Sequence, residues 1–350
     1  MRGFRNLDDL EWEPPAEGMA LLGANAQGKT NLLEACYYPV LFRSLRGAAD
    51  QDVTRFGGPG FHVEAHLEGG PVRAVGVTYH AAGKRKRIAL DGEEPVRMAD
   101  AAGAWLAVAF LPADVSLAAG PAADRRQYLD RMLSLADRRY LQALVRYRAA
   151  LAQRNSAMRQ GKIDLARAFD PPLAESGAEV IRGRERWIRE AAESFAGELE
   201  CIGERMAARL GYRGNPQLAD AREWPAALDA ALGQDRIRGM TTIGPHRDDL
   251  VIEIGGRPLR GVASTGQQRS TAVALKLVEL VSLRMARGTE PALVLDDVFA
   301  ELDRDRQRRL ARRVLGNGDR QVFLTAPRRD ELPPEADMPV WTIESGRVGR

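Results

Sequence analysis

Residues 23–30 have the spacing with which many proteins hold the phosphates of a nucleotide. They read Gly-Ala-Asn-Ala-Gln-Gly-Lys-Thr, which satisfies G-x-x-x-x-G-K-[ST], and they lie between an apolar run and a helix-like stretch. In such a loop the backbone N–H groups face the phosphates, Lys29 reaches the outer phosphates and Thr30 ligates Mg²⁺. The sequence therefore predicts a site for ATP and Mg²⁺. Contacts to ATP are expected from Gly23, Ala24, Asn25, Ala26, Gln27, Gly28, Lys29, Thr30 and Asn31.

Two adjacent carboxylates follow a second apolar run. Residues 292–295 predict a buried strand, and Asp296 and Asp297 come directly after it. In ATPases with a phosphate-binding loop, one acid binds Mg²⁺ and a second residue positions the attacking water. We therefore assign Asp296 to Mg²⁺, together with Thr30, and Asp297 to activation of water. With Lys29, these two acids are the predicted catalytic residues.

A polar segment ahead of a long helical stretch bears on the kind of ATPase. Residues 263–267 read Ala-Ser-Thr-Gly-Gln and resemble the signature of ABC-type ATPases. The resemblance implies that Ser264, Gly266 and Gln267 contact the γ-phosphate held by the opposite subunit, so that ATP joins two copies as a homodimer. Residues 301–303, Glu-Leu-Asp, resemble the loop that crosses the same interface. Ser264 to Gln267 also suit a helix cap and turn, and the sequence leaves both interpretations open.

The spacing of apolar residues predicts the elements that position these groups. A helix is expected at 31–42 and a long one at 267–285, and residues 61–91 predict an antiparallel meander. The C-terminal strands are expected to complete the sheet that begins at residue 19. Outside the meander, strands are predicted at 19–23, 105–111, 251–254, 293–295, 322–325 and 340–343.

Residues 121–240 have a helical pattern. One apolar face runs from Leu129 to Leu151 and a second from Val180 to Leu210, with Pro171 and Pro172 in the connection. The pattern predicts a helical hairpin. The expected fold is α/β: a P-loop ATPase head with a mixed sheet and an antiparallel β meander, formed by residues 1–120 and 241–350, plus an inserted all-helical lobe at 121–240.

Charge and hydropathy limit the partners and the location. The formal net charge is +3 and the sequence pI is about 9.0, which suits nucleic acid but suits many enzymes as well. Residues 84–87, Lys-Arg-Lys-Arg, are the densest basic run, and both a phosphate contact and a solvated loop remain open for them. Charges interrupt every apolar segment, and the N-terminus lacks a signal-peptide pattern. We expect a cytoplasmic protein without a membrane partner.

Several stretches along the whole chain resemble the RecF family, which is related to SMC-type ATPase heads. The most distinctive is Gly244-Pro245-His246-Arg247-Asp248-Asp249, and the others include residues 4–6, 28–35, 42–44, 110–114 and 125–130. The resemblance implies an ABC/SMC-like head with a helical lobe, and a weak, DNA-stimulated ATPase that acts in DNA replication and repair. It also implies binding to double-stranded DNA and to gapped or single-strand/double-strand junctions, and cooperation with RecO and RecR in loading recombinase.

One departure from the family pattern and two differences from ABC transporters bear on chemistry. Ala26 stands where the family commonly has Gly, which predicts a stiffer phosphate loop. Asp297 is one methylene shorter than the Glu of ABC transporters, which predicts slow turnover and a switch rather than a motor. The strand at 321–325 carries no His where a transporter-type switch His would lie, and Thr325 is the expected substitute.

Two other functions remain open at this level. An ABC transporter ATPase subunit would share the phosphate loop, signature and acid pair, although the missing His and the helical insertion argue against it. A scaffold that binds ATP to dimerise without hydrolysing it would also fit, although Asp296 and Asp297 favour hydrolysis. For residues 246–249, we prefer a turn with an ion pair over an acid–base site.

Overall fold

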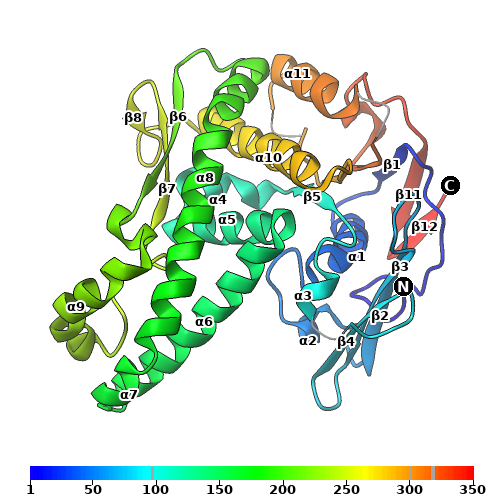
Figure 1. Ribbon diagram of the computed structural model, residues 1–350. Helices are drawn as coiled ribbons and strands as arrows, with labels where there is room; N and C mark the ends of the chain where they lie inside the picture. Colours follow the sequence, from blue (N-terminus) through cyan, green and yellow to red (C-terminus); the bar gives the residue numbers. More distant parts are fainter. Residues whose placement is uncertain (96–97, 300–301, 317–319) are drawn as a thin grey trace. The chain divides into compact units, whose positions relative to one another are not determined.

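The structure is a computed structural model that describes residues 1–95, 98–299, 302–316 and 320–350 (Figure 1). The chain forms two compact units, which we describe separately. Unit 1 comprises residues 1–114, 201–203 and 279–350, and unit 2 comprises residues 115–200 and 204–278. None of the helices in these described segments combines the length and apolar character needed to cross a membrane.

The helices and strands have the following bounds. Up to residue 120 they are β1 (Gly18–Leu22), α1 (Lys29–Leu41), α2 (Asp50–Val53), β2 (Gly60–His66), β3 (Ala74–His80), β4 (Arg85–Leu90), α3 (Met98–Ala101), β5 (Ala107–Phe110), η1 (Pro112–Val115) and α4 (Ser116–Ala119). Residues 121–240 form α5 (Ala122–Ala136), α6 (Arg138–Arg159), α7 (Ile163–Arg167), α8 (Asp170–Ile202), β6 (Ala208–Arg213), η2 (Pro216–Ala219), η3 (Ala221–Glu223) and α9 (Trp224–Arg238). The remainder forms β7 (Asp249–Ile254), β8 (Arg257–Pro258), α10 (Thr265–Arg287), β9 (Ala292–Leu295), α11 (Arg304–Leu315), β10 (Val322–Ala326), η4 (Arg329–Glu331), β11 (Val340–Glu344) and β12 (Arg347–Gly349).

A six-stranded sheet forms the centre of unit 1, in the order β12-β11-β1-β10-β9-β5. Five of its strands are parallel, and only β12 runs antiparallel to its neighbour. Strands β5, β9 and β10 are buried along their whole length, which explains why they read as continuous apolar runs. Because the strands are parallel, the segments that follow β1, β9 and β10 all emerge at one edge of the sheet.

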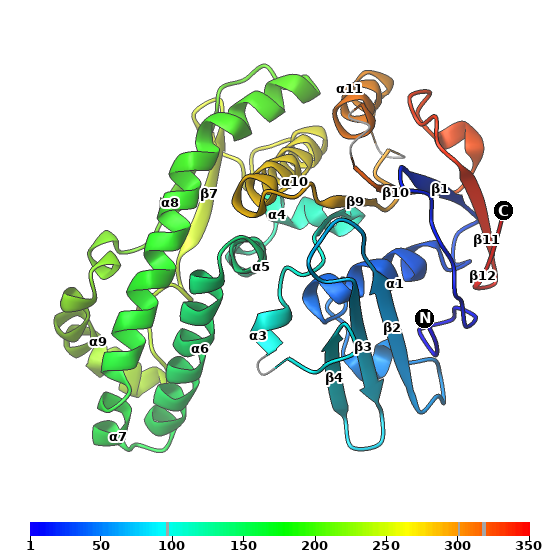
Figure 2. The ribbon, with the colours of Figure 1, turned by 45° about the vertical axis from the view of Figure 1, so that its right-hand side comes forward.

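A second sheet in unit 1 is the antiparallel meander β2-β3-β4, whose strands lie side by side in Figure 2. In β2, buried and more exposed residues alternate, as in half-buried antiparallel strands, whereas the central strand β3 is buried from Val75 to Val77. On the buried face, Phe61 and Tyr79 stack beside Phe4 and Tyr38. The predicted fold class, an α/β head with a mixed sheet and an antiparallel meander, is confirmed.

Long helices dominate unit 2, but the first one is interrupted. Helices α6 and α8 run side by side in both views (Figures 1 and 2), as expected for a helical hairpin. The apolar face expected from Leu129 to Leu151 is divided between α5 and α6, because Asp137 adopts an extended backbone and its carboxylate accepts a hydrogen bond from the N–H of Arg139. A side-chain cap at this position starts a new helix.

The expected second helix was wrong at both ends. Pro171 and Pro172 lie in the first turn of α8 rather than in the connection, where proline is tolerated because the first N–H groups have no partner within the helix. At the other end α8 stops at Ile202, where Gly203 has a φ of 105°. Leu210 therefore belongs to β6, a strand that we had assigned to the helix.

The strand at 251–254 was also misassigned. It is part of β7, which pairs with β6 and β8 in a separate three-stranded antiparallel sheet of unit 2 and does not complete the six-stranded sheet. As a result, residues 241–278 group with the helices in unit 2, whereas we expected them in the head. The functional division into 1–120 with 241–350 and 121–240 stays a prediction, because compactness alone does not test it.

A buried polar network surrounds the segment Gly244–Asp249 in unit 2. Arg184, only 2% exposed, donates hydrogen bonds to Asp130 Oδ1 at 2.7 Å and to the carbonyl of Pro245 at 2.6 Å. Arg125 makes a two-pronged ion pair with Asp249, at 2.8 and 3.0 Å. The expected turn and ion pair are therefore present.

His246 has a structural place in this network. Its Nε2 lies 2.9 Å from the carbonyl of Thr241, which can only accept, so Nε2 carries the proton and Nδ1 accepts from the Tyr147 hydroxyl. Burial lowers the pKa of His246 to about 4. The ring is therefore neutral near pH 7, which suits a fixed pair of hydrogen bonds better than proton transfer.

Replacing Arg184 with Ala should lower the free energy of unfolding by about 3 kcal/mol or more, because the Asp130 carboxylate loses its buried cation and the Pro245 carbonyl loses its donor. Urea unfolding followed by circular dichroism measures the change. Arg148→Ala is the control: Arg148 also pairs with Asp130, at 2.9 Å, but its side chain is 58% exposed. We expect that change to cost less than about 1 kcal/mol. Equal losses would contradict the importance of the buried pair.

Candidate nucleotide site

The predicted phosphate loop connects β1 to α1 at the carboxyl edge of the six-stranded sheet. Gly28 precedes α1 with a φ of 117°, a conformation that favours glycine. Ala26 also has a left-handed backbone, with a φ of 66°. A methyl group at such a position is strained by about 1–2 kcal/mol, so the family's usual Gly would relax this loop, in line with the stiffness expected from the sequence.

The structure brings the predicted Mg²⁺ ligands together. The Thr30 hydroxyl lies 2.8 Å from Asp296 Oδ2 and 3.1 Å from Oδ1. A hydroxyl and a carboxylate are hard oxygen donors of the kind that Mg²⁺ prefers. Lys29 is buried in the same loop, with its Nζ 2.7 Å from the carbonyl of Gly23. The donor set fits Mg²⁺, and the loop with its cation fits nucleotide phosphates.

The second acid lies beside the first, and Thr325 lies between them. The Thr325 hydroxyl donates to Asp296 Oδ1 at 2.9 Å and accepts from the backbone N–H of Asp297 at 3.0 Å. Burial raises the pKa of Asp297, and the negative charge of Asp296 raises it further. A base with a raised pKa is better matched to accepting a proton near neutral pH.

The hairpin β11–β12 braces the phosphate loop, a feature that the sequence interpretation missed. The backbone N–H of Ser345 donates to Gln27 Oε1 at 2.7 Å, and that of Gly346 donates to the carbonyl of Gln27 at 2.9 Å. Gly346 has a φ of 83°, and a Cβ there would lie 2.1 Å from the carbonyl oxygen of Asn6. The Ser-Gly turn between two strand patterns was the available signal, but only the fold shows what the turn contacts.

Two segments singled out by the family resemblance meet at a buried carboxylate of α1. Glu34 accepts hydrogen bonds from Arg5 at 3.0 Å, from Arg46 at 2.6 Å and from Ser44 at 2.5 Å. Burial by itself raises the pKa of Glu34, but the hydrogen bonds from Arg46, Arg5 and Ser44 outweigh it, and the pKa is lowered overall. Arg46 also donates to Asn31 at 2.5 Å. These contacts fix the first two turns of the helix that follows the phosphate loop.

The signature-like segment begins α10 in unit 2. The backbone N–H of Ser264 donates to Gln267 Oε1 at 3.0 Å, and that of Gln267 donates to Ser264 Oγ at 3.3 Å. This reciprocal pair is a capping box. Ser264 is exposed and Gly266 lies in the first turn, so the helix N-terminus also presents the groups that a phosphate from another subunit would meet. The helix-cap interpretation is correct as geometry and is compatible with the second role.

Of the segment expected to cross the dimer interface, the structure describes Leu302 and Asp303. Glu301 lies outside the described residues. Asp303 caps α11 by accepting hydrogen bonds from the N–H groups of Asp305 and Arg306.

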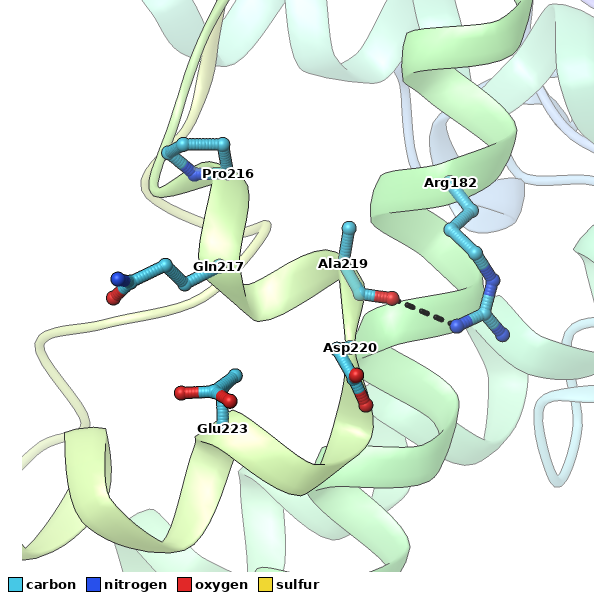
Figure 3. Close-up of a pocket in the computed structure, with 6 residues that line it drawn as sticks. All are labelled: Arg182, Pro216, Gln217, Ala219, Asp220 and Glu223. Carbon is cyan, nitrogen blue, oxygen red and sulfur yellow. Dashed lines mark hydrogen bonds between the residues drawn. The ribbon is translucent and has the colours of Figure 1, made fainter.

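A surface hollow of 590 Å³ in unit 2 is a poor candidate for nucleotide. Figure 3 shows its lining, in which Arg182 donates to the carbonyl of Ala219 at 2.8 Å. Asp220 and Glu223 also face it, and hydrogen bonds from Arg222 lower the pKa of Asp220 to about 2. The resident carboxylates disfavour an anionic ligand here.

Comparison with known proteins gives full-length similarity to one family. No protein-family model matches. The chain is 36% identical over 363 residues to the DNA replication and repair protein RecF of Anaeromyxobacter sp. (strain Fw109-5), covering 99% of this chain and 97% of that protein. RecF of Roseiflexus castenholzii is also 36% identical, over 99% of this chain and 98% of its own length.

Solved structures agree in fold. A structure of the recombination mediator protein RecF with ATP in the RecFOR pathway matches 99% of this chain and 94% of that one, with a TM-score of 0.89 and 29% identity. An SMC head bound to the C-terminal winged-helix domain of ScpA has a TM-score of 0.57 at 16% identity and covers 94% of that chain. The second likeness shows the ATPase-head fold alone.

Gly346→Ala should weaken ATP binding by about tenfold, because the new methyl group displaces the hairpin and each of its hydrogen bonds to Gln27 contributes about 1 kcal/mol. Titration with a fluorescent ATP analogue measures the affinity. Gly92→Ala is a matched control, since Gly92 has a φ of 84° but open space around its Cβ position. An equal loss in both variants would mean that backbone strain, and not the brace, sets the affinity.

Asp297→Asn should raise the melting temperature at pH 7 in Mg²⁺-free buffer while abolishing hydrolysis. The folded-state pKa of Asp297 is raised, so the folded protein holds this proton more tightly than the unfolded chain, and stability falls as the pH rises through that pKa. At pH 7 the ionised carboxylate is therefore destabilising, and the neutral amide removes the cost.

Thermal melts and phosphate release measure the two effects. Asp305→Asn, at an acid whose side chain is 76% exposed, should change neither. A lower melting temperature for Asp297→Asn would contradict the inference that the ionised Asp297 carboxylate destabilises the fold.

Proposed function

Because the chain belongs to the RecF family of DNA replication and repair proteins, we propose that it is an ATP-dependent, DNA-binding recombinational repair protein whose ATPase site works as a slow switch. The observation that supports this most directly is the 2.8 Å contact between Thr30 of the phosphate loop and Asp296. That contact joins a phosphate-binding loop to an acid pair, as hydrolysis requires. The full-length RecF relatives leave the transporter alternative without support.

The proposed chemistry assigns one task to each side chain. Lys29 binds the β- and γ-phosphates, and Thr30 and Asp296 hold Mg²⁺, which neutralises phosphate charge when bound. Asp297 accepts a proton from a water molecule. The water oxygen forms a bond to the γ-phosphorus, and the bond between the γ-phosphorus and the oxygen shared with the β-phosphate breaks. The products are ADP and phosphate. The aspartate reaches one methylene less far than a glutamate, so we expect slow turnover.

The proposed switch requires two copies of the chain. In it, Ser264, Gly266 and Gln267 of one copy contact the γ-phosphate held by residues 23–31 of the other, which makes ATP part of the dimer interface. The closed dimer binds gapped DNA or single-strand/double-strand junctions and cooperates with RecO and RecR in loading recombinase. The head of residues 1–120 and 241–350 carries the ATP site, and the lobe of residues 121–240 completes the clamp. Hydrolysis reopens it.

Light scattering with no nucleotide, with ADP and with ATP tests the switch. We expect ATP alone to dimerise the wild type. Lys29→Met should bind no ATP and stay monomeric, whereas Ser264→Arg should bind ATP with unchanged affinity and still stay monomeric, because the arginine blocks only the contact to the second copy.

Gln217→Arg is a control for Ser264→Arg, since it adds the same side chain to the acidic hollow of unit 2 and should leave ATP-dependent dimerisation intact. A wild-type protein that binds ATP yet stays monomeric with gapped DNA present would contradict the proposal.

A further inference from the structure

One aromatic side chain is fully exposed at an edge of the meander sheet. Phe56 has a relative exposure of 103%, whereas no other large exposed apolar side chain in the described part of the chain is aromatic. It lies in a tight turn in which the N–H of Gly58 donates to the carbonyl of Arg55, and Gly57 has a φ of 71° with open space around it. Both faces of the ring are therefore available to a ligand.

The base of this turn is rigid. A Cβ on Gly3 would lie 2.5 Å from the carbonyl of Gly60, and one on Gly60 would lie 1.9 Å from the carbonyl of Tyr79, so the backbones are in close contact. Beneath them Phe61 stacks against Tyr79 with ring centroids 5.6 Å apart. The exposed ring thus projects from a fixed platform and contributes no buried surface to the fold.

Basic side chains lie at the same edge of the sheet. The N–H of Ala81 donates to the carbonyl of Pro59, which places the β3–β4 turn beside the Phe56 turn. Lys84 in that turn and Arg85 at the start of β4 are exposed and, among the described residues, have no ion pair. The same holds for Arg2, whose backbone bridges to His62 of β2.

The neighbouring charges separate this edge from an ordinary solvated loop. Lys86 pairs with Asp50 at 2.8 Å and Arg87 with Glu94 at 3.4 Å, so the second half of the basic run is already neutralised. Of the two acids near the Phe56 turn, Asp9 pairs with Arg55 and accepts from the N–H of Gly3, whereas Asp52 is exposed. Arg2, Lys84 and Arg85 therefore lie at this end of the sheet without an ion pair among the described residues.

We propose that this edge binds single-stranded DNA, with Phe56 stacking on an unpaired base and Lys84 and Arg85 contacting the flanking phosphates. Cations that follow a backbone, combined with an aromatic ring that offers its face, are how proteins hold unpaired nucleotides. Bases within a duplex are already stacked on one another, so they offer no free face to the Phe56 ring. A protein partner would need apolar neighbours for Phe56, whereas its chain neighbours are Arg55, Gly57 and Gly58. The inference rests on the proposed DNA-binding function and assigns the unpaired strand of the junction to this edge.

The test compares two labelled DNAs of the same sequence, one with a thymidine gap and one fully duplex, by fluorescence anisotropy in the presence of ATP. Phe56→Ala should bind the gapped DNA about fivefold or more weakly than the wild type, since stacking on one base is worth that much. Binding to the duplex should be unchanged. Because Phe56 is fully exposed, the substitution should leave the melting temperature unaltered.

Two matched variants separate stacking from apolar contact. Phe56→Trp should keep the affinity for gapped DNA. The fluorescence that the new tryptophan adds to the wild-type signal should be quenched when that DNA binds. Phe56→Leu keeps an apolar side chain but lacks a ring, so it should behave like Phe56→Ala. Lys84→Ala with Arg85→Ala should reduce the dependence of gapped-DNA affinity on salt concentration.

The outcomes distinguish this inference from the function on which it rests. If the wild type binds gapped DNA and dimerises with ATP but Phe56→Ala binds equally well, the stacking site is wrong and the proposed function stands. If the wild type binds no DNA, the proposed function fails first. If Phe56→Ala loses binding to purified RecR or RecO while DNA affinity is unchanged, the edge is a protein-docking surface and our inference is overturned.

Discussion

The contact between Thr30 and Asp296 joins side chains 266 residues apart in the chain, and parallel strand order makes it possible. Strand β1 pairs with β10, and β10 pairs with β9, all in the same direction. The loops after these strands must therefore emerge at one edge, where the phosphate loop, the acid pair and Thr325 meet. Any change that reversed a strand or shifted the sheet register would separate the cation, the metal ligands and the base.

Bringing two carboxylates together at this edge of the sheet has an electrostatic cost, which is seen at Asp297. Asp296 and Asp297 are adjacent carboxylates, and the raised pKa of Asp297 reflects its burial and the charge of its neighbour. Mg²⁺ arriving with nucleotide would bring positive charge to the acid pair, so binding of Mg²⁺ and relief of the repulsion are coupled. An ATPase held in this way is suited to responding strongly to whether nucleotide is bound, which is what a switch needs.

Sequence patterns predicted the chemical groups better than the topology. The phosphate loop, the acid pair and the meander each depend on local spacing, which can be read from the sequence without knowledge of the fold. The errors arose where strand pairing between distant segments decides the secondary structure or the sheet. The residues of β6 were predicted to be helical because Leu210 continued an apolar stripe. Strand β7 was assigned to the wrong sheet because its partner, β6, had not been recognised. The break at Asp137 was readable, since an Asp before a helical run is a cap signal.

The contacts that hold the site together were the least predictable. The hairpin turn at Gly346 is linked to the phosphate loop only through folding, and so are Arg5 and Arg46 as the partners of Glu34. Cys201 is exposed near the end of α8, where the sequence interpretation had extended the helix too far.

The central claim is that one copy's phosphate loop works with the other copy's signature segment, and mixing two inactive variants tests it most directly. Lys29→Met has an intact signature and Ser264→Arg an intact phosphate loop, so a mixed dimer contains one complete ATP site. We expect equimolar mixing to restore ATP-dependent dimers and part of the ATPase activity that neither variant has alone. If the mixture is as inactive as its components although each variant is folded, the trans-acting signature is contradicted and residues 264–267 serve only as the cap of α10.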